Sequence, residues 1–213
     1  MVSEQEKARR LARYREIRPQ LRTGDIALFS SRTSFFSKVI RWATGSRWSH
    51  VGMVVHISEW DVTLLWESNT SNKFSDVSDG IGKCGVQLLV LSEVLREYDG
   101  TIAFRHLDVS DDVRSGFVPK LRELREEVRN RPYEKDFFSL ASVPFQFLYR
   151  WKKKDLASLF CSELVAEAYL RMGLITEARA SSAFAPGDFG NPPPEGRAAL
   201  SLALGALGPE IPL

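Results

Sequence analysis

Short apolar runs and helically spaced apolar residues follow one another along this chain, and the two patterns predict most of its elements. Runs rich in Val, Ile, Leu and Phe are typical of strands, whereas apolar residues three and four apart favour amphipathic helices. The predicted strands cover residues 26–29, 48–57, 62–68, 86–91 and 101–107. The predicted helices cover residues 3–18, 34–43, 111–130 and 160–172. Residues 71–84 are polar and contain glycine, so we expect a loop there.

The two ends of the chain differ from the middle. Ser3 and Glu6 have the spacing of a capping box at the start of a charged helix, which Pro19 ends. The C-terminal tail is rich in Pro, Gly and Ala, and we expect it to pack loosely or to be disordered. The predicted organisation is an N-terminal charged helix (1–19), one α+β domain (20–190) and the tail (191–213).

Composition excludes several classes of protein. The chain has 213 residues with 29 basic and 27 acidic side chains, and a net charge of only +2 argues against a dedicated nucleic-acid binder. Two cysteines are too few for a disulfide-rich scaffold or a Cys-rich zinc site, and we expect neither a metal nor another cofactor. The longest uncharged run, Phe137–Tyr149, has 13 residues and is too short to span a membrane.

No export signal is recognisable near the N-terminus. Residues 1–22 carry seven Lys or Arg and three Glu, with no apolar segment behind them. We therefore predict a cytoplasmic protein with free thiols. A peripheral membrane contact is compatible with this prediction.

Cys161 lies in the first turn of the helix predicted at 160–172. It shares one apolar face with Leu164, Val165, Ala168 and Met172. The partial positive charge of a helix N-terminus stabilises a thiolate, and the free N–H groups there can stabilise an oxyanion. A cysteine on such a face can also be an ordinary small buried hydrophobe, and the residues alone leave both interpretations open.

The hairpin 48–68 offers a histidine and a carboxylate to this thiol. If Ile57 pairs with Val62, then His50 and Glu67 are diagonal neighbours on one face of the sheet. A register shifted by one residue would separate them, and Asn69 would then be the alternative partner of His50. A histidine can take the proton of a thiol, and a third polar residue can fix the orientation of the imidazole.

The other cysteine and histidines have no comparable pattern around them. Cys84 lies in the predicted loop, and His56 and His106 favour structural roles. A metal site made from His50, His56 and Cys161 lacks convincing ligand spacing.

Five segments together carry a family resemblance. They recur in the same order in the circularly permuted NlpC/P60 papain-like proteins of the YiiX-like branch, and they are Leu21–Phe29, Gly45–Val54, Trp66–Ser68, Arg131–Tyr133 and Phe160–Val165. The chain resembles this family over about residues 20–190, and the Trp-Ser-His-Val-Gly and Phe-Cys-Ser-Glu-Leu-Val segments are its specific motifs.

The resemblance implies a permuted papain-like fold, in which an antiparallel sheet packs against the helix that bears the nucleophile. It implies that Cys161 is the nucleophile, His50 the base and Glu67 the orienting residue. Tyr133 matches a family position that lines the substrate site, although Asn130-Arg131 replaces the usual Gly-Lys-like pair. The resemblance therefore predicts a cysteine hydrolase that cleaves a peptide or N-acyl amide bond through an acyl-enzyme.

Two alternatives stay open. One is a lipid acyl hydrolase, acyltransferase or thioesterase like the lecithin:retinol acyltransferase-like proteins, favoured by the aromatic stretch 137–151 and the basic residues Arg150, Lys152, Lys153 and Lys154. The other is a catalytically silent binding module. The substrate is accordingly expected to be a small molecule, a peptide or a lipid acyl compound.

Overall fold

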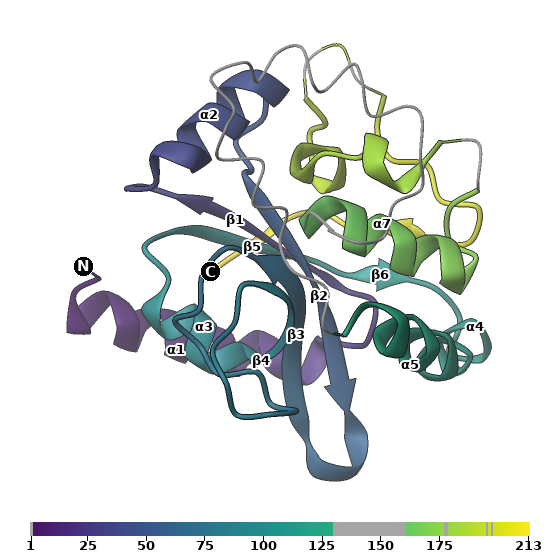
Figure 1. Cartoon of the computed structure of the whole chain (residues 1–213), viewed down its shortest axis with the longest axis horizontal. Coiled ribbons are helices and arrows are strands. Elements are labelled where there is room, and N and C mark those ends of the chain that lie inside the picture. The colour runs from purple at the N-terminus through teal and green to yellow at the C-terminus, as the bar shows by residue number, and fades with distance from the viewer. Residues whose placement is uncertain (1, 130–160, 177–178, 195, 197) are drawn as a thin grey trace.

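The chain folds around a six-stranded antiparallel sheet of order β4-β3-β2-β1-β5-β8 (Figure 1). The computed structural model describes residues 2–129, 161–176, 179–194, 196 and 198–213. The strands of this sheet are β1 Ile26–Ser31, β2 His50–Ile57, β3 Val62–Asn69, β4 Gly85–Val90, β5 Gly100–Arg105 and β8 Ile211–Pro212. A second, two-stranded sheet pairs β6 Leu107–Asp108 with β7 Ala206–Leu207.

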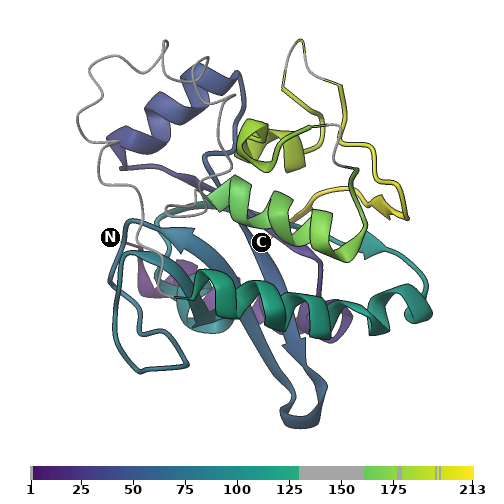
Figure 2. The same cartoon turned by 45° about the vertical axis from the view of Figure 1, so that its right-hand side comes forward.

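Helices cover both faces of the large sheet. The α-helices are α1 Glu4–Ile17, α2 Phe35–Thr44, α3 Leu91–Glu97, α4 Asp111–Ser115, α5 Phe117–Val128 and α7 Cys161–Met172. Short 3-10 helices are η1 Arg18–Gln20, η2 Ser58–Trp60, η5 Ser181–Ala183 and η6 Pro186–Phe189. Helices α5 and α7 lie side by side on one face, and α1 and α3 lie on the other (Figures 1 and 2).

The sheet is buried on both faces because its residues alternate between two cores. Val51 and Met53 of β2 pack with α5 and α7, whereas Val54 packs with α1 and α3. This burial explains why the strands are nearly continuous apolar runs rather than alternating polar and apolar sequences. None of the helices in the described part of the chain is long and apolar enough to cross a membrane.

The β2–β3 hairpin has the predicted register. Ile57 pairs with Val62 and Met53 pairs with Trp66, and η2 forms the connection between the strands. Gly52 lies in this hairpin, where a Cβ atom would come within 2.6 Å of the Leu65 side chain. The close approach explains why the smallest residue follows the His50-Val51 pair.

Two predicted elements end differently in the structure. The helix predicted over 111–130 is divided into α4 and α5 at Gly116. Pro119 lacks a backbone N–H, so it is tolerated in the first turn of α5 but not within a continuous helix. The strand predicted over 86–91 ends at Val90, and Leu91 instead begins α3, which the apolar pattern did not predict.

The N-terminal helix is less solvated than its sequence indicates. It begins after Ser3, whose hydroxyl accepts a hydrogen bond from the Glu6 amide at 3.2 Å. Arg10, Tyr14 and Ile17 are buried. The Arg10 guanidinium donates to the Leu95 and Gly100 carbonyl oxygens at 2.9 and 3.1 Å, so it fastens the helix to α3 and β5.

The C-terminal tail, for which we expect loose packing or disorder, is mostly exposed but pairs with the rest of the chain at two short strands. Ile211–Pro212 forms β8 beside β5, and Ala206–Leu207 pairs with β6. Arg105 donates to the carbonyl oxygens of Leu207 and Gly208 at 2.8 and 2.7 Å. The strand pairings and the Arg105 bonds are made to the tail's backbone, so a composition rich in Pro, Gly and Ala does not indicate them. Leu207 and Ile211 also pack against the two cores.

Candidate functional site

Helix α7 places Cys161 at its first position, with only 6% of the residue exposed. The next residue, Ser162, is also buried, and its hydroxyl donates to the Phe184 carbonyl oxygen at 2.7 Å. This bond fixes the start of the helix against the segment around η5. The thiol therefore lies where N–H groups without intrahelical partners and the positive end of the helix dipole meet.

His50 begins β2 and contacts Glu67 of β3. The imidazole Nε2 lies 2.7 Å from Glu67 Oε2, so the ring donates to the carboxylate. The side chains are 17% and 3% exposed, respectively. The Phe29 ring, on the neighbouring strand, packs at 5.6 Å from the imidazole. The predicted diagonal contact between His50 and Glu67 is thus present.

Two amides hold the second oxygen of Glu67. Asn69 Nδ2 donates to Oε1 at 3.0 Å, and Gln87 Nε2 donates to the same atom at 3.1 Å. Asn69 therefore supports Glu67 rather than replacing it as the partner of His50. Because both carboxylate oxygens are occupied, the orientation of Glu67 is fixed from three sides.

The charges of this cluster favour a protonated imidazole. Burial by itself lowers the pKa of His50, but the negative charges of Cys161 and Glu67, together with hydrogen bonds to both, raise it to about 10. Burial by itself raises the pKa of Glu67, but His50, Asn69 and Gln87 bring it below its ordinary value. Since Nε2 donates to Glu67, we infer that Nδ1 is the ring nitrogen that hydrogen-bonds to Cys161.

Two residues beside this cluster did not emerge from the sequence. Gln87 pairs with Glu67 across β3 and β4 and is only 1% exposed. The sequence could have indicated Gln87, because it is the one polar residue of an otherwise apolar strand. Tyr98 follows α3 and packs edge-on against Phe29 at 5.0 Å. Burial raises the pKa of its hydroxyl, and the negative charges of Glu67 and Cys161 raise it further.

The remaining sequence candidates lie elsewhere. Tyr133 and the aromatic stretch 137–151 lie outside the described residues. Cys84 is exposed, and its thiol donates to the Thr70 carbonyl oxygen at 2.9 Å. His56 Nδ1 lies 3.2 Å from the Thr63 hydroxyl, and His106 Nδ1 lies 2.8 Å from Asp25 Oδ2.

The comparisons with known proteins concern the fold. No model of a protein family matches the chain, and no curated protein matches it. Among solved structures it is similar to the crystal structure of the metalloprotein YiiX from Escherichia coli O157:H7, which carries a domain of unknown function. The identity is 18% and the TM-score 0.50, and the match covers 91% of this chain and 97% of YiiX. The chain therefore has a YiiX-like mixed α/β fold.

Proposed function

We propose that this protein is a cysteine hydrolase that cleaves a peptide or N-acyl amide bond through an acyl-enzyme on Cys161. The observation that carries the proposal is the position of His50. One ring nitrogen lies 2.7 Å from the Glu67 carboxylate, and the charge of the Cys161 thiolate raises the pKa of the same ring. Nucleophile, proton carrier and orienting group thus form one connected series, as thiol catalysis requires.

We further propose that the fold is a permuted papain-like fold. Helix α7 packs on the face of the sheet formed by β2 and β3 and presents its first residue to the beginning of β2. The histidine and the carboxylate precede the cysteine in the chain, as the resemblance to permuted NlpC/P60 proteins implies. The likeness to YiiX supports this interpretation at the level of the fold.

In the acylation step, the Cys161 thiolate attacks the carbonyl carbon and forms a C–S bond. The carbonyl electrons move to the oxygen, and the N–H groups at the start of α7 stabilise the resulting oxyanion. The oxyanion then collapses, the C–N bond breaks, and the His50 imidazolium gives its proton to the leaving amine. Glu67 keeps the ring oriented and stabilises its charge throughout.

Deacylation reverses the role of the histidine. His50 is now neutral and takes a proton from water while the water oxygen attacks the thioester carbonyl. The tetrahedral intermediate releases the carboxylic acid product as the C–S bond breaks. The electrons of that bond return to sulfur, so the thiolate–imidazolium pair is restored.

A metal does not fit these residues. YiiX is described as a metalloprotein, but the described residues of this chain hold no group of three or more His, Cys, Asp or Glu arranged to bind an ion. His50 Nε2 is bonded to Glu67 rather than free for a ligand. We place the reaction in the cytoplasm, where a reducing environment keeps both cysteines as thiols.

The decisive experiment compares the two cysteines with a thiol-reactive acyl probe at about pH 6, where an ordinary thiol is almost fully protonated. The wild type and Cys84→Ala should be labelled rapidly and at equal rates. Cys161→Ala should lose the rapid labelling and all amide hydrolysis. Equal labelling of the two single variants would refute the nucleophile assignment. A panel of peptides, N-acyl amino acids, thioesters and phospholipids then identifies the substrate class.

A further inference from the structure

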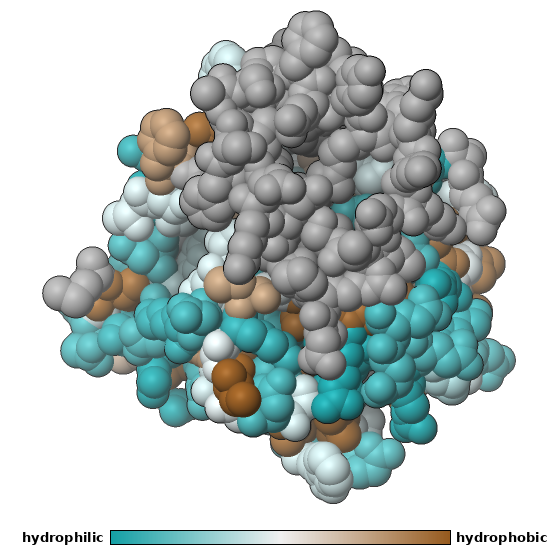
Figure 3. Space-filling model, in the orientation of Figure 1, coloured by the Kyte–Doolittle hydropathy of each residue, from teal (hydrophilic) through white to brown (hydrophobic). Residues whose placement is uncertain are grey.

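Helix α2 presents aromatic side chains to solvent. Phe35 is 79% exposed and Trp42 is 78% exposed. They lie seven residues apart, hence on the same side of the helix, and the exposed Lys38 lies between them. Apolar residues also reach the surface over α2 in Figure 3, at the upper left. The outward side of a helix on a globular protein is normally polar, so two exposed aromatic rings on one side of α2 are unusual.

The inward side of α2 is held by polar contacts. Ser37 is buried, and its hydroxyl lies 2.6 Å from that of Ser49, the residue before His50. The helix begins at the Ser34 cap, which accepts from the Ser37 amide at 3.2 Å, and ends at Gly45 in the left-handed conformation. These contacts fix the rotation of α2, so the exposure of Phe35 and Trp42 is built into the fold.

The stretch of sequence that contains α2 has basic residues and no acidic ones. Residues 26–58 contain no Asp or Glu, although acidic residues make up 27 of the 213 positions. The same segment contains Arg32, Lys38, Arg41 and Arg47, of which Arg32 is paired with Glu6 at 3.5 Å and Arg47 is paired with Glu210. Helix α2 itself carries Lys38 and Arg41 and no carboxylate. Such a segment is complementary to an anionic surface rather than to a basic one.

We propose that α2 is an interfacial helix that docks the protein on an anionic membrane surface. Aromatic rings prefer the headgroup region, and a lysine between them can reach up to lipid phosphates while its alkyl stem stays with the apolar face. A bilayer fits this helix better than a protein groove does. The helix exposes only a few aromatic side chains, and their attraction to a lipid surface does not require a partner of complementary shape. Docking would hold the His50 end of β2 close to the lipid surface. This proposal does not depend on the proposed hydrolase activity.

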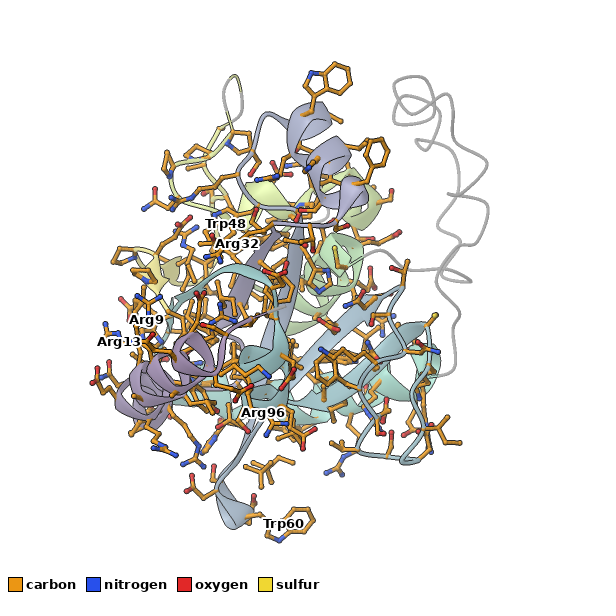
Figure 4. All side chains as sticks on the ribbon, turned by 90° about the vertical axis from the view of Figure 1, so that its left-hand side faces the viewer. Arg9, Arg13, Arg32, Trp48, Trp60 and Arg96 are labelled. Atoms are coloured by element: carbon orange, nitrogen blue, oxygen red, sulfur yellow. The ribbon has the colours of Figure 1, made fainter. Side chains whose placement is uncertain are left out.

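Trp60 provides a matched control. It is 76% exposed, at the tip of the β2–β3 hairpin, and Figure 4 shows it projecting from the end of the molecule opposite α2. Its neighbours Glu59 and Asp61 are acidic, so it does not suit an anionic surface. Trp60→Ala therefore removes an indole as exposed as that of Trp42, from a site that should not touch the membrane.

The test is vesicle flotation of the full chain with phosphatidylcholine alone and with phosphatidylcholine plus phosphatidylglycerol. The wild type should bind the anionic vesicles, less strongly at high salt. The double variant Phe35→Ala/Trp42→Ala should bind at least about tenfold more weakly, and Lys38→Glu should also lose binding. Trp60→Ala should bind like the wild type.

Three outcomes would overturn the proposal. They are absence of wild-type binding to anionic vesicles, equal binding by the double variant, and equal loss in Trp60→Ala. A wild-type dimer that the double variant abolishes, without vesicle binding, would assign α2 to a contact between two copies instead. Circular dichroism and thermal midpoints establish that the variants are folded. Labelling of Cys161 by the soluble acyl probe reports on the proposed hydrolase separately, so either proposal can fail without the other.

Discussion

The protein contains two buried histidine–carboxylate contacts that look alike locally. In one, His50 lies 2.7 Å from Glu67, and in the other, His106 lies 2.8 Å from Asp25. Both carboxylates are almost completely buried, and both histidines are partly exposed. Distance and burial alone therefore do not indicate which of the two pairs has a role in catalysis.

The surroundings of the pairs separate them. Beyond the His50 ring lies the Cys161 thiol at a helix N-terminus, whereas His106 Nε2 is buried with no hydrogen-bond partner in the described part of the chain. Asp25 also accepts from the backbone amides of Arg22 and Leu107, at 3.0 and 2.9 Å. Asp25 therefore binds mainly backbone N–H groups and fixes the path of the chain. Glu67 is held by side-chain amides and fixes the orientation of the His50 ring.

The two pairs are distinguished by the group that lies next to the second ring nitrogen of each histidine. A histidine held by a carboxylate can transfer a proton only if its second nitrogen meets a group that needs one. Glu67 belongs to a series of polar side chains that ends at Cys161, the proposed nucleophile. Asp25 belongs to a clamp that joins the start of β1 to β6 and, through Arg114 at 3.7 Å, to α4.

Replacing each histidine with alanine should give the largest difference between the two pairs. His50→Ala should lower the acylation rate by about 10²- to 10⁴-fold, the range that removal of a general acid–base group gives. His106→Ala should change the rate by no more than about twofold, because its ring contacts no reacting group. Single-turnover acylation of equal amounts of folded protein measures both. A large loss in His106→Ala together with a small loss in His50→Ala would reverse the assignment.

Removal of the Asp25 carboxylate should lower the stability of the protein without lowering its activity. Asp25→Ala leaves the buried Leu107 amide and the partly buried Arg22 amide without this acceptor, and we expect a loss of about 2–3 kcal/mol in the free energy of unfolding. Urea denaturation measures this loss. The fraction that remains folded should label at Cys161 at the wild-type rate. Slow labelling of folded Asp25→Ala would mean that the clamp also positions the thiol.

The smallest expected effect concerns the pH dependence of Glu67→Gln. The negative charge of Glu67 helps to raise the pKa of His50 to about 10. A neutral glutamine at this position should therefore lower the pKa of His50. A raised pKa keeps the imidazolium, and hence acylation, until the pH rises through it. The alkaline limb of the rate profile should therefore move to lower pH in the variant, by about one pH unit for each 1.4 kcal/mol of interaction that the substitution removes. Glu59→Gln, on the exposed hairpin tip, should leave the limb unchanged. An unmoved limb in Glu67→Gln would contradict the assigned role.

Much of the fold and part of the site could be predicted from the sequence. Apolar periodicity located the strands around His50 and Glu67, and the pairing of Ile57 with Val62 brought the two residues within reach. Helical spacing located Cys161 at the start of its helix. These features depend on neighbours in sequence or on a short hairpin, so local patterns are sufficient to predict them.

The rest depends on contacts between distant segments. Nothing near Cys161 indicates that α7 packs beside β2, and only the family resemblance supplied that proximity. Gln87 comes from a third strand, and Arg105 holds the tail through carbonyl oxygens, which every residue possesses. The exposure of Phe35 and Trp42 was also hidden, because their spacing suits a buried helix face as well as an exposed one.

Strand β8 has a consequence for association between copies of this chain. A strand at the edge of a sheet offers unpaired N–H and C=O groups on which another chain can add. Here that edge position is taken by only two residues, Ile211–Pro212, and proline has no N–H to donate. A second chain would find almost no ladder to extend, so this end of the sheet is protected against strand-by-strand aggregation.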